Sequence, residues 1–218
     1  PYPVHTLEEA MVIPATIHEK NAALPFDRVM LAKALGTTPA SSGFTMKLSS
    51  ASKYGLTEGG YNDETIALTA LGDSIVAAGD DAERHQVMLA AAIRPELFHR
   101  FYEMLDGKRL PDDSYARDIL QRELDVDASL TQECLRIIKH NGLLAGLLGD
   151  VGGSLYVSLA GSHGQQPSDG QAVATRVDGE AAAGGPEATP PGPESQAGPG
   201  MVFIGHAGNS DVVDFLKH

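Results

Sequence analysis

The sequence predicts a mainly α fold, and three features of the chain lead to this prediction. Apolar residues recur at helical spacing through most of residues 1–150, and Gly, Pro and short polar stretches separate these runs. One pair of short strand patterns lies between residues 56 and 68. After residue 150 the composition changes and the helical pattern stops. We therefore expect one helical region followed by segments of a different kind.

The first predicted helix begins after Thr6. Thr6 and Glu9 have the spacing of a capping box, in which each side chain bonds the backbone amide of the other residue. Pro14 lies inside the same apolar pattern and should kink the helix, because proline has no amide hydrogen to donate. A second helix is predicted over residues 27–35 and ends at Gly36, a good residue for a helix end.

The third predicted helix spans residues 39–54, with Thr38 as its N-cap. Two strand patterns follow over residues 56–58 and 64–68, with Gly, Asn and Asp between them to form a turn. Three helices followed by a β-hairpin is the order of a winged helix-turn-helix. We therefore assign residues 1–79 to a winged-helix-like domain.

Residues 80–150 are expected to continue as a helical bundle. Each predicted helix carries an apolar stripe, and the helices span residues 82–93, 95–105, 113–124 and 129–148. The short loops between them favour antiparallel neighbours. We expect this helical extension to pack on the winged-helix-like domain.

The rest of the chain divides into a linker and the start of a second domain. We expect a flexible, disordered linker over residues 151–200, because residues 161–200 hold nine Gly, six Pro and no aromatic residue. Such a segment buries too little apolar surface to offset about 1–2 kcal/mol of backbone entropy per residue. Residues 201–218 read as a short strand, a loop and an amphipathic helix, which is the first unit of an α/β fold.

The charge and composition restrict the kinds of partner. A net charge of −13 excludes a surface that binds nucleic acid throughout, so any DNA contact needs a local basic patch. Residues 20–60 provide one, with five basic residues against two acidic ones. No apolar run approaches the ~20 residues of a membrane span, and the first residues lack a signal-peptide pattern, so we expect a cytoplasmic protein without membrane contact. Cys134 is the only cysteine, and its helical context predicts a packed thiol.

The third predicted helix carries polar side chains outside its apolar stripe. In a winged helix this element enters the major groove, where hydroxyls and lysines contact phosphates and bases. The DNA-binding candidates are Ser42, Thr45, Lys47, Ser49, Ser50 and Lys53. This helix has no arginine, the residue that most often reads guanine, and the predicted wing from Glu58 to Glu64 is acidic. DNA binding and a role in protein recognition or self-association both stay open.

Two stretches together resemble a known family. Residues 201–206 followed by residues 209–216 resemble the opening of bacterial TIR-like domains of the predicted nucleotide-binding type, in which a Val-Phe-Ile-x-His strand precedes a loop and an amphipathic helix. Residues 53–57 with residues 66–72 are similar to the helical, winged-helix-like region found ahead of such domains in some prokaryotic proteins.

The resemblance implies a recognition module coupled to a domain that binds or hydrolyses NAD or a related nucleotide in antiviral defence. It maps Gly205, His206, Gly208 and Asn209 onto the nucleotide-facing first loop, which also lies where open α/β folds bind ligands. The Ala207 position departs from the family, where a Gly followed by a basic or polar residue is typical. The catalytic glutamate of TIR enzymes lies beyond this first helix, so the resemblance assigns no catalytic residue and no cofactor to this chain.

Our leading interpretation is a regulatory or recognition module of a TIR-like protein, which associates with itself or with a protein partner. The alternative is a DNA-binding transcription regulator whose third helix reads DNA. Whether the protein is an enzyme stays open, with NAD hydrolysis expected only of a longer protein. The sequence offers no metal-ligand cluster, Walker motif or Ser/His/Asp arrangement in a recognisable context.

Overall fold

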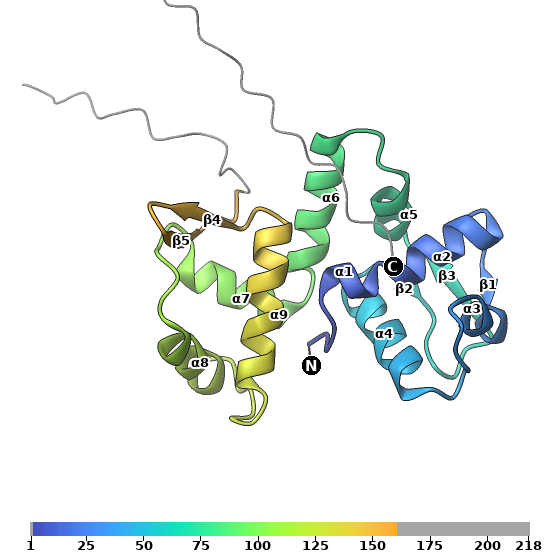
Figure 1. The fold of residues 1–218 in the computed structure, drawn as a ribbon, viewed down its shortest axis with the longest axis horizontal. Helices are drawn as coiled ribbons and strands as arrows, with labels where there is room; N and C mark the ends of the chain where they lie inside the picture. The colour runs from blue at the N-terminus through green and yellow to red at the C-terminus, as the bar shows by residue number, and fades with distance from the viewer. Residues whose placement is uncertain (1, 161–218) are drawn as a thin grey trace, which may run out of the picture. The chain divides into compact units, whose positions relative to one another are not determined.

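The computed structural model describes residues 2–160 of the chain, which form mostly helices with small antiparallel sheets (Figure 1). The mainly α prediction is therefore confirmed at this level. In chain order the elements are α1 (Leu7–Ala10), α2 (Val12–Asn21), β1 (Phe26–Asp27), α3 (Arg28–Ala34), α4 (Ser42–Lys53), β2 (Thr57–Glu58), β3 (Thr65–Leu68), α5 (Ala70–Ala77), α6 (Asp81–Ile93), α7 (Glu96–Leu105), α8 (Asp113–Arg122), α9 (Thr131–Leu144), β4 (Leu148–Val151) and β5 (Ser154–Val157).

The first helical stretch is split in two rather than kinked. The capping box is present, with the Glu9 amide donating to Thr6 and the Thr6 amide donating to the Glu9 carboxylate at 2.9 Å. Pro14 lies in the first turn of α2, where a missing amide hydrogen costs nothing. The proline cannot donate to the carbonyl of Ala10, so α1 ends there and α2 starts again at Val12.

The first sheet joins a strand that the sequence pattern did not predict to the predicted hairpin. The strand order is β1-β3-β2, and both pairings are antiparallel. Phe26 pairs with Ile66 in one ladder, and Thr57 pairs with Leu68 in the other. Chain order is thus two helices, a strand, two helices and two strands, with the hairpin directly after α4.

The start of α4 differs from the prediction. A helix was expected from residue 39 with Thr38 as N-cap, but the Ser41 amide donates to the Thr38 carbonyl at 3.0 Å and closes a separate turn. The helix begins only at Ser42. The predicted inward face is confirmed, because Phe44 and Leu48 are buried.

The second half of the described chain ends in a hairpin instead of a helix and linker. A helix to residue 148 and a linker from residue 151 were expected, whereas α9 ends at Leu144 and β4 pairs with β5 over residues 148–157. Main-chain groups of residues 106–110 bond the outer edge of β5, so that the hairpin is held by the connection between α7 and α8.

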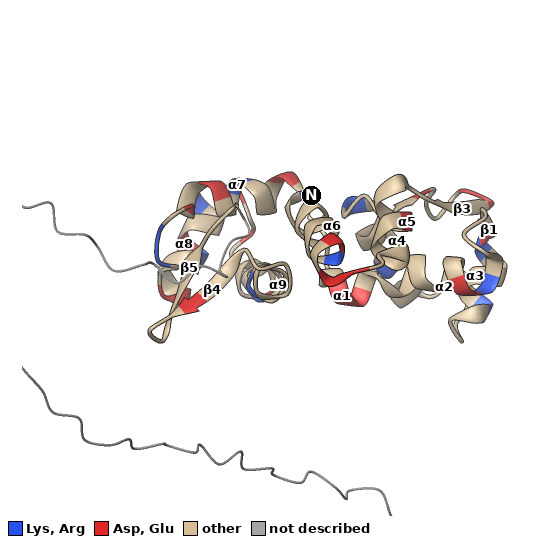
Figure 2. Ribbon diagram, turned by 90° about the horizontal axis from the view of Figure 1, so that it is seen from above, with Lys and Arg blue, Asp and Glu red and all other residues tan. Residues whose placement is uncertain are grey.

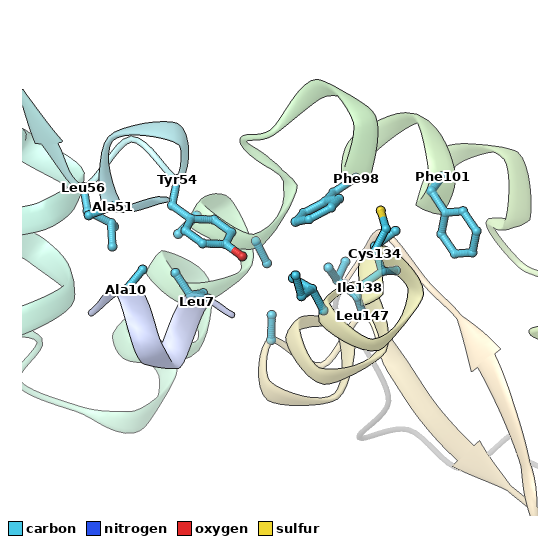
Figure 3. Packing of buried hydrophobic residues seen from close by; sticks show 14 of the residues in the cluster. Leu7, Ala10, Ala51, Tyr54, Leu56, Phe98, Phe101, Cys134, Ile138 and Leu147 are labelled. Carbon is cyan, nitrogen blue, oxygen red and sulfur yellow. The ribbon is translucent and has the colours of Figure 1, made fainter. Parts of the chain in front are cut away.

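One hydrophobic core runs through both halves, as Figure 3 shows. Leu7 and Tyr54 come from α1 and the end of α4, and they meet Phe98 of α7 and Ile138 of α9 in one cluster. The rings of Tyr54 and Phe98 are tilted, with centroids 6.4 Å apart. The described residues accordingly belong to one compact unit.

A buried hydrogen-bond chain crosses the same interface. Asn141 of α9 is fully buried, its Oδ1 accepts from the Leu7 amide at 2.8 Å, and its Nδ2 donates to the Tyr54 hydroxyl at 2.8 Å. The Tyr54 hydroxyl in turn donates to the His5 carbonyl at 2.7 Å. Because these buried polar groups bond one another, the cost of removing them from water is offset, and the network fixes α1, α4 and α9 relative to one another.

Candidate interaction surface

The outer side of α4 is the surface on which the predicted DNA-binding residues were expected to gather. Ser42 and Ser49 are exposed there, and Thr45 is half-buried, with its hydroxyl donating to the Ser41 carbonyl at 3.0 Å. Met46 lies on the same side with 43% of its surface exposed. The structure therefore brings three of the six candidates onto one face, together with a methionine that sequence reasoning missed.

Two other candidates turn inward, which corrects the prediction. Ser50 is completely buried, and its hydroxyl accepts a hydrogen bond from the His5 amide. Lys53 is half-buried, and its ammonium donates to the Tyr2 carbonyl at 3.1 Å. The N-terminal segment covers this side of α4, so Ser50 cannot reach DNA and Lys53 serves as a tie between segments.

Lys47 lies on the opposite flank of α4. It is two positions from Ser49, which is about 200° around a helix of 3.6 residues per turn. Its neighbours are Phe44 and Leu35, which line with it a small hollow of about 280 Å³. Lys47 and the exposed hydroxyls therefore do not form one basic, hydroxyl-rich strip.

Arg28 is the basic residue nearest to the β2–β3 loop, and it is already engaged. Its Nε donates to the Asp63 carbonyl at 3.1 Å, and another guanidinium nitrogen donates to the Pro39 carbonyl at 3.3 Å. The guanidinium also lies over the Tyr61 ring, 5.2 Å from its centroid. The Arg28 side chain thus connects the loop to the start of α3 and to the turn before α4.

The β2–β3 loop itself is acidic, as the sequence indicated. Glu58, Asp63 and Glu64 are all exposed, and the Asp63 carboxylate accepts from the Gly60 amide at 2.7 Å to close the turn. The carboxylates of Glu58 and Glu64 have no partner among the described residues. A negative loop thus stands directly after the helix that a DNA reader would use.

A charged groove between α8 and α9 is a second surface, and no motif in the sequence pointed to it. The groove has a volume of about 590 Å³ and is lined mainly by polar and charged side chains. Its charged lining residues are Asp113, Arg117, Glu133, Arg136 and Lys139. The only local signal was the recurrence of charged residues three positions apart along α9.

Within residues 2–160, four of the five charged side chains in the groove form ion pairs, and one does not. Arg136 holds Glu133 in a two-pronged ion pair with a shortest distance of 2.7 Å, and its hydrogen bonds lower the pKa of the Glu133 carboxyl. Lys139 pairs with Asp113 at 2.9 Å. Arg117 donates its Nε to the Asp113 main-chain carbonyl and has no carboxylate partner within the described residues. The groove therefore retains one cation whose charge is not offset.

Cys134 is a packed thiol, as predicted. It is fully buried, and burial raises the pKa of the thiol to about 12, against the lowering effect of its hydrogen bond with Tyr2. A thiol with so high a pKa is a poor nucleophile. No three His, Cys, Asp or Glu side chains within residues 2–160 are placed to hold a metal ion together.

The remaining predictions concern residues outside those described. Most of the predicted linker and the segment 201–218, with Gly205, His206, Gly208 and Asn209, lie there. Within residues 2–160, no helix is long and apolar enough to cross a membrane. Comparison of the chain with protein-family models, curated proteins and solved structures finds no match.

Proposed function

We propose that the described unit is a winged-helix module that recognises protein and regulates the domain attached to it. The order of helices and strands, and a sheet in the order β1-β3-β2, support the winged-helix assignment. In this assignment α4 takes the place of the recognition helix, and the β2–β3 loop is the wing.

The observation that carries the proposal is that the basic side chains near α4 do not gather on one outward face. DNA binding depends on cations that neutralise phosphates. Lys20 lies on α2, Arg28 donates to the main-chain carbonyls of Asp63 and Pro39, and Lys53 is turned towards the main-chain carbonyl of Tyr2. Within the described chain only two of the five basic residues of this region, Lys33 and Lys47, are left without a partner. A surface of this kind suits a protein partner better than a phosphate backbone.

In the intact protein, the attached domain is proposed to be TIR-like and to bind NAD or a related nucleotide in antiviral defence. The resemblance of residues 201–216 to the opening of such domains supports this part. It is tested by titrating NAD against the protein together with whatever residues its gene encodes after 218. Binding should weaken in His206→Ala, and an absence of NAD binding by that protein would contradict this part alone.

The role of α4 is tested by titrating a labelled random-sequence DNA duplex with the full chain at about 50 mM salt, where electrostatic binding is strong. We expect no saturable binding at micromolar protein. Binding that is lost in both Lys47→Ala and Lys53→Ala, and kept in Lys20→Ala, would overturn the proposal. Lys20 serves as the matched control because it lies on α2 and is paired with its neighbour.

The second candidate is a DNA-binding regulator, and one observation favours it. Ser42, Ser49 and Ser52 are exposed on one side of α4, and small hydroxyls can bond phosphates and base edges. The same titration decides between the two candidates. For a DNA reader, a Ser49→Glu variant would lose affinity at every salt concentration, because a carboxylate would face the phosphates.

A further inference from the structure

We propose that the unit assembles with copies of itself, with the β2–β3 loop of one copy docking into the α8–α9 groove of the next. The loop and the groove carry opposite charges, and both are exposed on the same chain. The contact uses surfaces other than the outer side of α4. An experiment can therefore contradict the proposed assembly without contradicting the proposed lack of DNA binding, and the reverse also holds.

The groove offers a place for a carboxylate. Arg117 is half-buried, and its two terminal nitrogens have no acceptor among the described residues, because only Nε is used. Arg136 and Lys139 stand beside it in exposed ion pairs, which contribute only about 0–1 kcal/mol each and can exchange partners at low cost. An incoming acidic group would thus meet three cations, one of them without a carboxylate partner.

The loop offers matching groups in a fixed arrangement. Tyr61 is half exposed near its tip, and aromatic side chains of this kind anchor many protein interfaces. The exposed carboxylates of Glu58 and Glu64 lie on either side of Tyr61 in the sequence and have no described partner. Because Arg28 already holds the loop through Asp63 and the Tyr61 ring, little entropy is lost when it docks. The carboxylates of the loop can then reach the cations of the groove.

The position of the two surfaces determines the type of assembly. In Figure 1, α8 and α9 lie on one side of the described unit, whereas β1, β3 and α3 lie on the other, and Figure 2 shows the same separation from above. One copy therefore cannot fill its own groove, and in the head-to-tail arrangement that we propose the loop of each copy enters the groove of the next. A contact between two different surfaces repeats from copy to copy, giving a ring or a filament.

The net charge of −13 should make this contact weak, and the attraction between the acidic loop and the cations of the groove should make it salt-sensitive. Copies repel one another over most of their surface, and opposite charges meet only where a loop enters a groove. Sedimentation velocity of the full chain should show species larger than a dimer growing with protein concentration at about 50 mM salt. These species should dissociate at about 500 mM salt, where screening is much stronger.

Two variants separate this contact from any other form of association. Arg117→Glu blocks the groove and leaves the loop intact, whereas the double variant Tyr61→Ala, Glu64→Ala blocks the loop and leaves the groove intact. In each variant alone, association should be weakened at least about tenfold. An equimolar mixture should form a dimer and grow no further, because only one productive contact is left.

Matched controls alter charge elsewhere. Lys33→Glu on α3 and Glu103→Ala on α7 change exposed residues whose side chains have no described partner, and both should assemble as the unaltered chain does. The proposal is overturned by an unaltered chain that stays monomeric at low salt or stops at a dimer. It is equally overturned if the mixture of groove and loop variants does not associate.

Discussion

The two β-hairpins of the unit are built in different ways. The hairpin of β2 and β3 has only two cross-strand pairs and a six-residue loop, from Gly59 to Glu64. The hairpin of β4 and β5 has four pairs and turns at Gly152 and Gly153. Local turn residues and ladder length would favour the second hairpin, yet the sequence pattern revealed only the first.

Both hairpins are completed by a segment distant in sequence. β1 covers the open edge of β3, with Arg28 donating its amide to the Glu64 carbonyl at 2.9 Å. The chain after α7 covers β5, where Val157 donates to the Lys108 carbonyl at 3.0 Å and Leu110 donates to the Leu155 carbonyl at 2.7 Å. A two-stranded hairpin is marginal by itself, so the third segment in each case decides whether it forms. The first hairpin also packs against helix α5. We therefore expect substitutions at this contact to lower the stability of the unit the most.

The largest expected effect is that of Gly72→Ala, which separates α5 from the first hairpin. A Cβ at Gly72 would overlap the main-chain carbonyl oxygen of Leu56, just before β2, and backbone cannot move aside as a flexible side chain can. We expect a loss of about 3 kcal/mol in the free energy of unfolding. Urea denaturation measures this loss. Gly43→Ala in α4 is the control, since only the Ser41 hydroxyl lies near, and it should be neutral or slightly stabilising.

The second-largest loss of stability is expected at a glycine of the first hairpin, and a glycine of the second hairpin provides the comparison. Gly59 has a φ of +94°, and a Cβ there would lie 2.6 Å from the Thr65 carbonyl oxygen, whereas Gly153 has a φ of +80° with open space around it. Gly59→Ala combines backbone strain with a clash and should cost about 2–3 kcal/mol. Gly153→Ala carries the strain alone, about 1–2 kcal/mol. Equal losses in thermal or urea unfolding would show that the two turns are equally constrained.

The hairpins also show what the sequence could and could not reveal about the fold. The strands around residues 56–68 were predictable because turn residues separate two apolar runs. β1 has only two residues and no periodicity, and its stability comes from pairing with β3. The β4–β5 hairpin was missed because Leu147 and Leu148 continue the apolar stripe of α9, and Gly152 and Gly153 resemble the start of a linker.

The candidate surface shows the same limit at single residues. Helical spacing correctly placed Ser42 and Ser49 outside, but it could not show that the N-terminal segment covers Ser50. In α9, Asn141 is buried and Leu143 is 53% exposed, the reverse of what polarity suggests. The hydrogen bonds to Leu7 and Tyr54 that hold Asn141 inside involve residues that no local pattern connects with α9.

A smaller effect should follow from Arg28→Ala in the first hairpin. The change removes the bonds to the carbonyls of Asp63 and Pro39 and the contact with Tyr61, all on a half-exposed surface. We expect a stability loss of about 1–2 kcal/mol and faster amide hydrogen exchange over residues 59–64. Exchange over residues 148–157 should stay as it is. Unchanged exchange in the β2–β3 loop would mean that Arg28 does not hold it.

The smallest effect is expected at the turn of the second hairpin. The Asp150 carboxylate accepts from the Gly153 amide at 2.9 Å, in an exposed turn. Asp150→Ala removes this one bond, and an exposed bond of this kind contributes about 0.5–1 kcal/mol. Asp150→Asn keeps an acceptor oxygen and should restore most of the loss. Because residues 106–110 hold β5 independently of the turn, amide exchange in β5 should hardly change in either variant. Fast exchange at Val157 in Asp150→Ala would instead show that the turn, and not the covering segment, keeps this hairpin together.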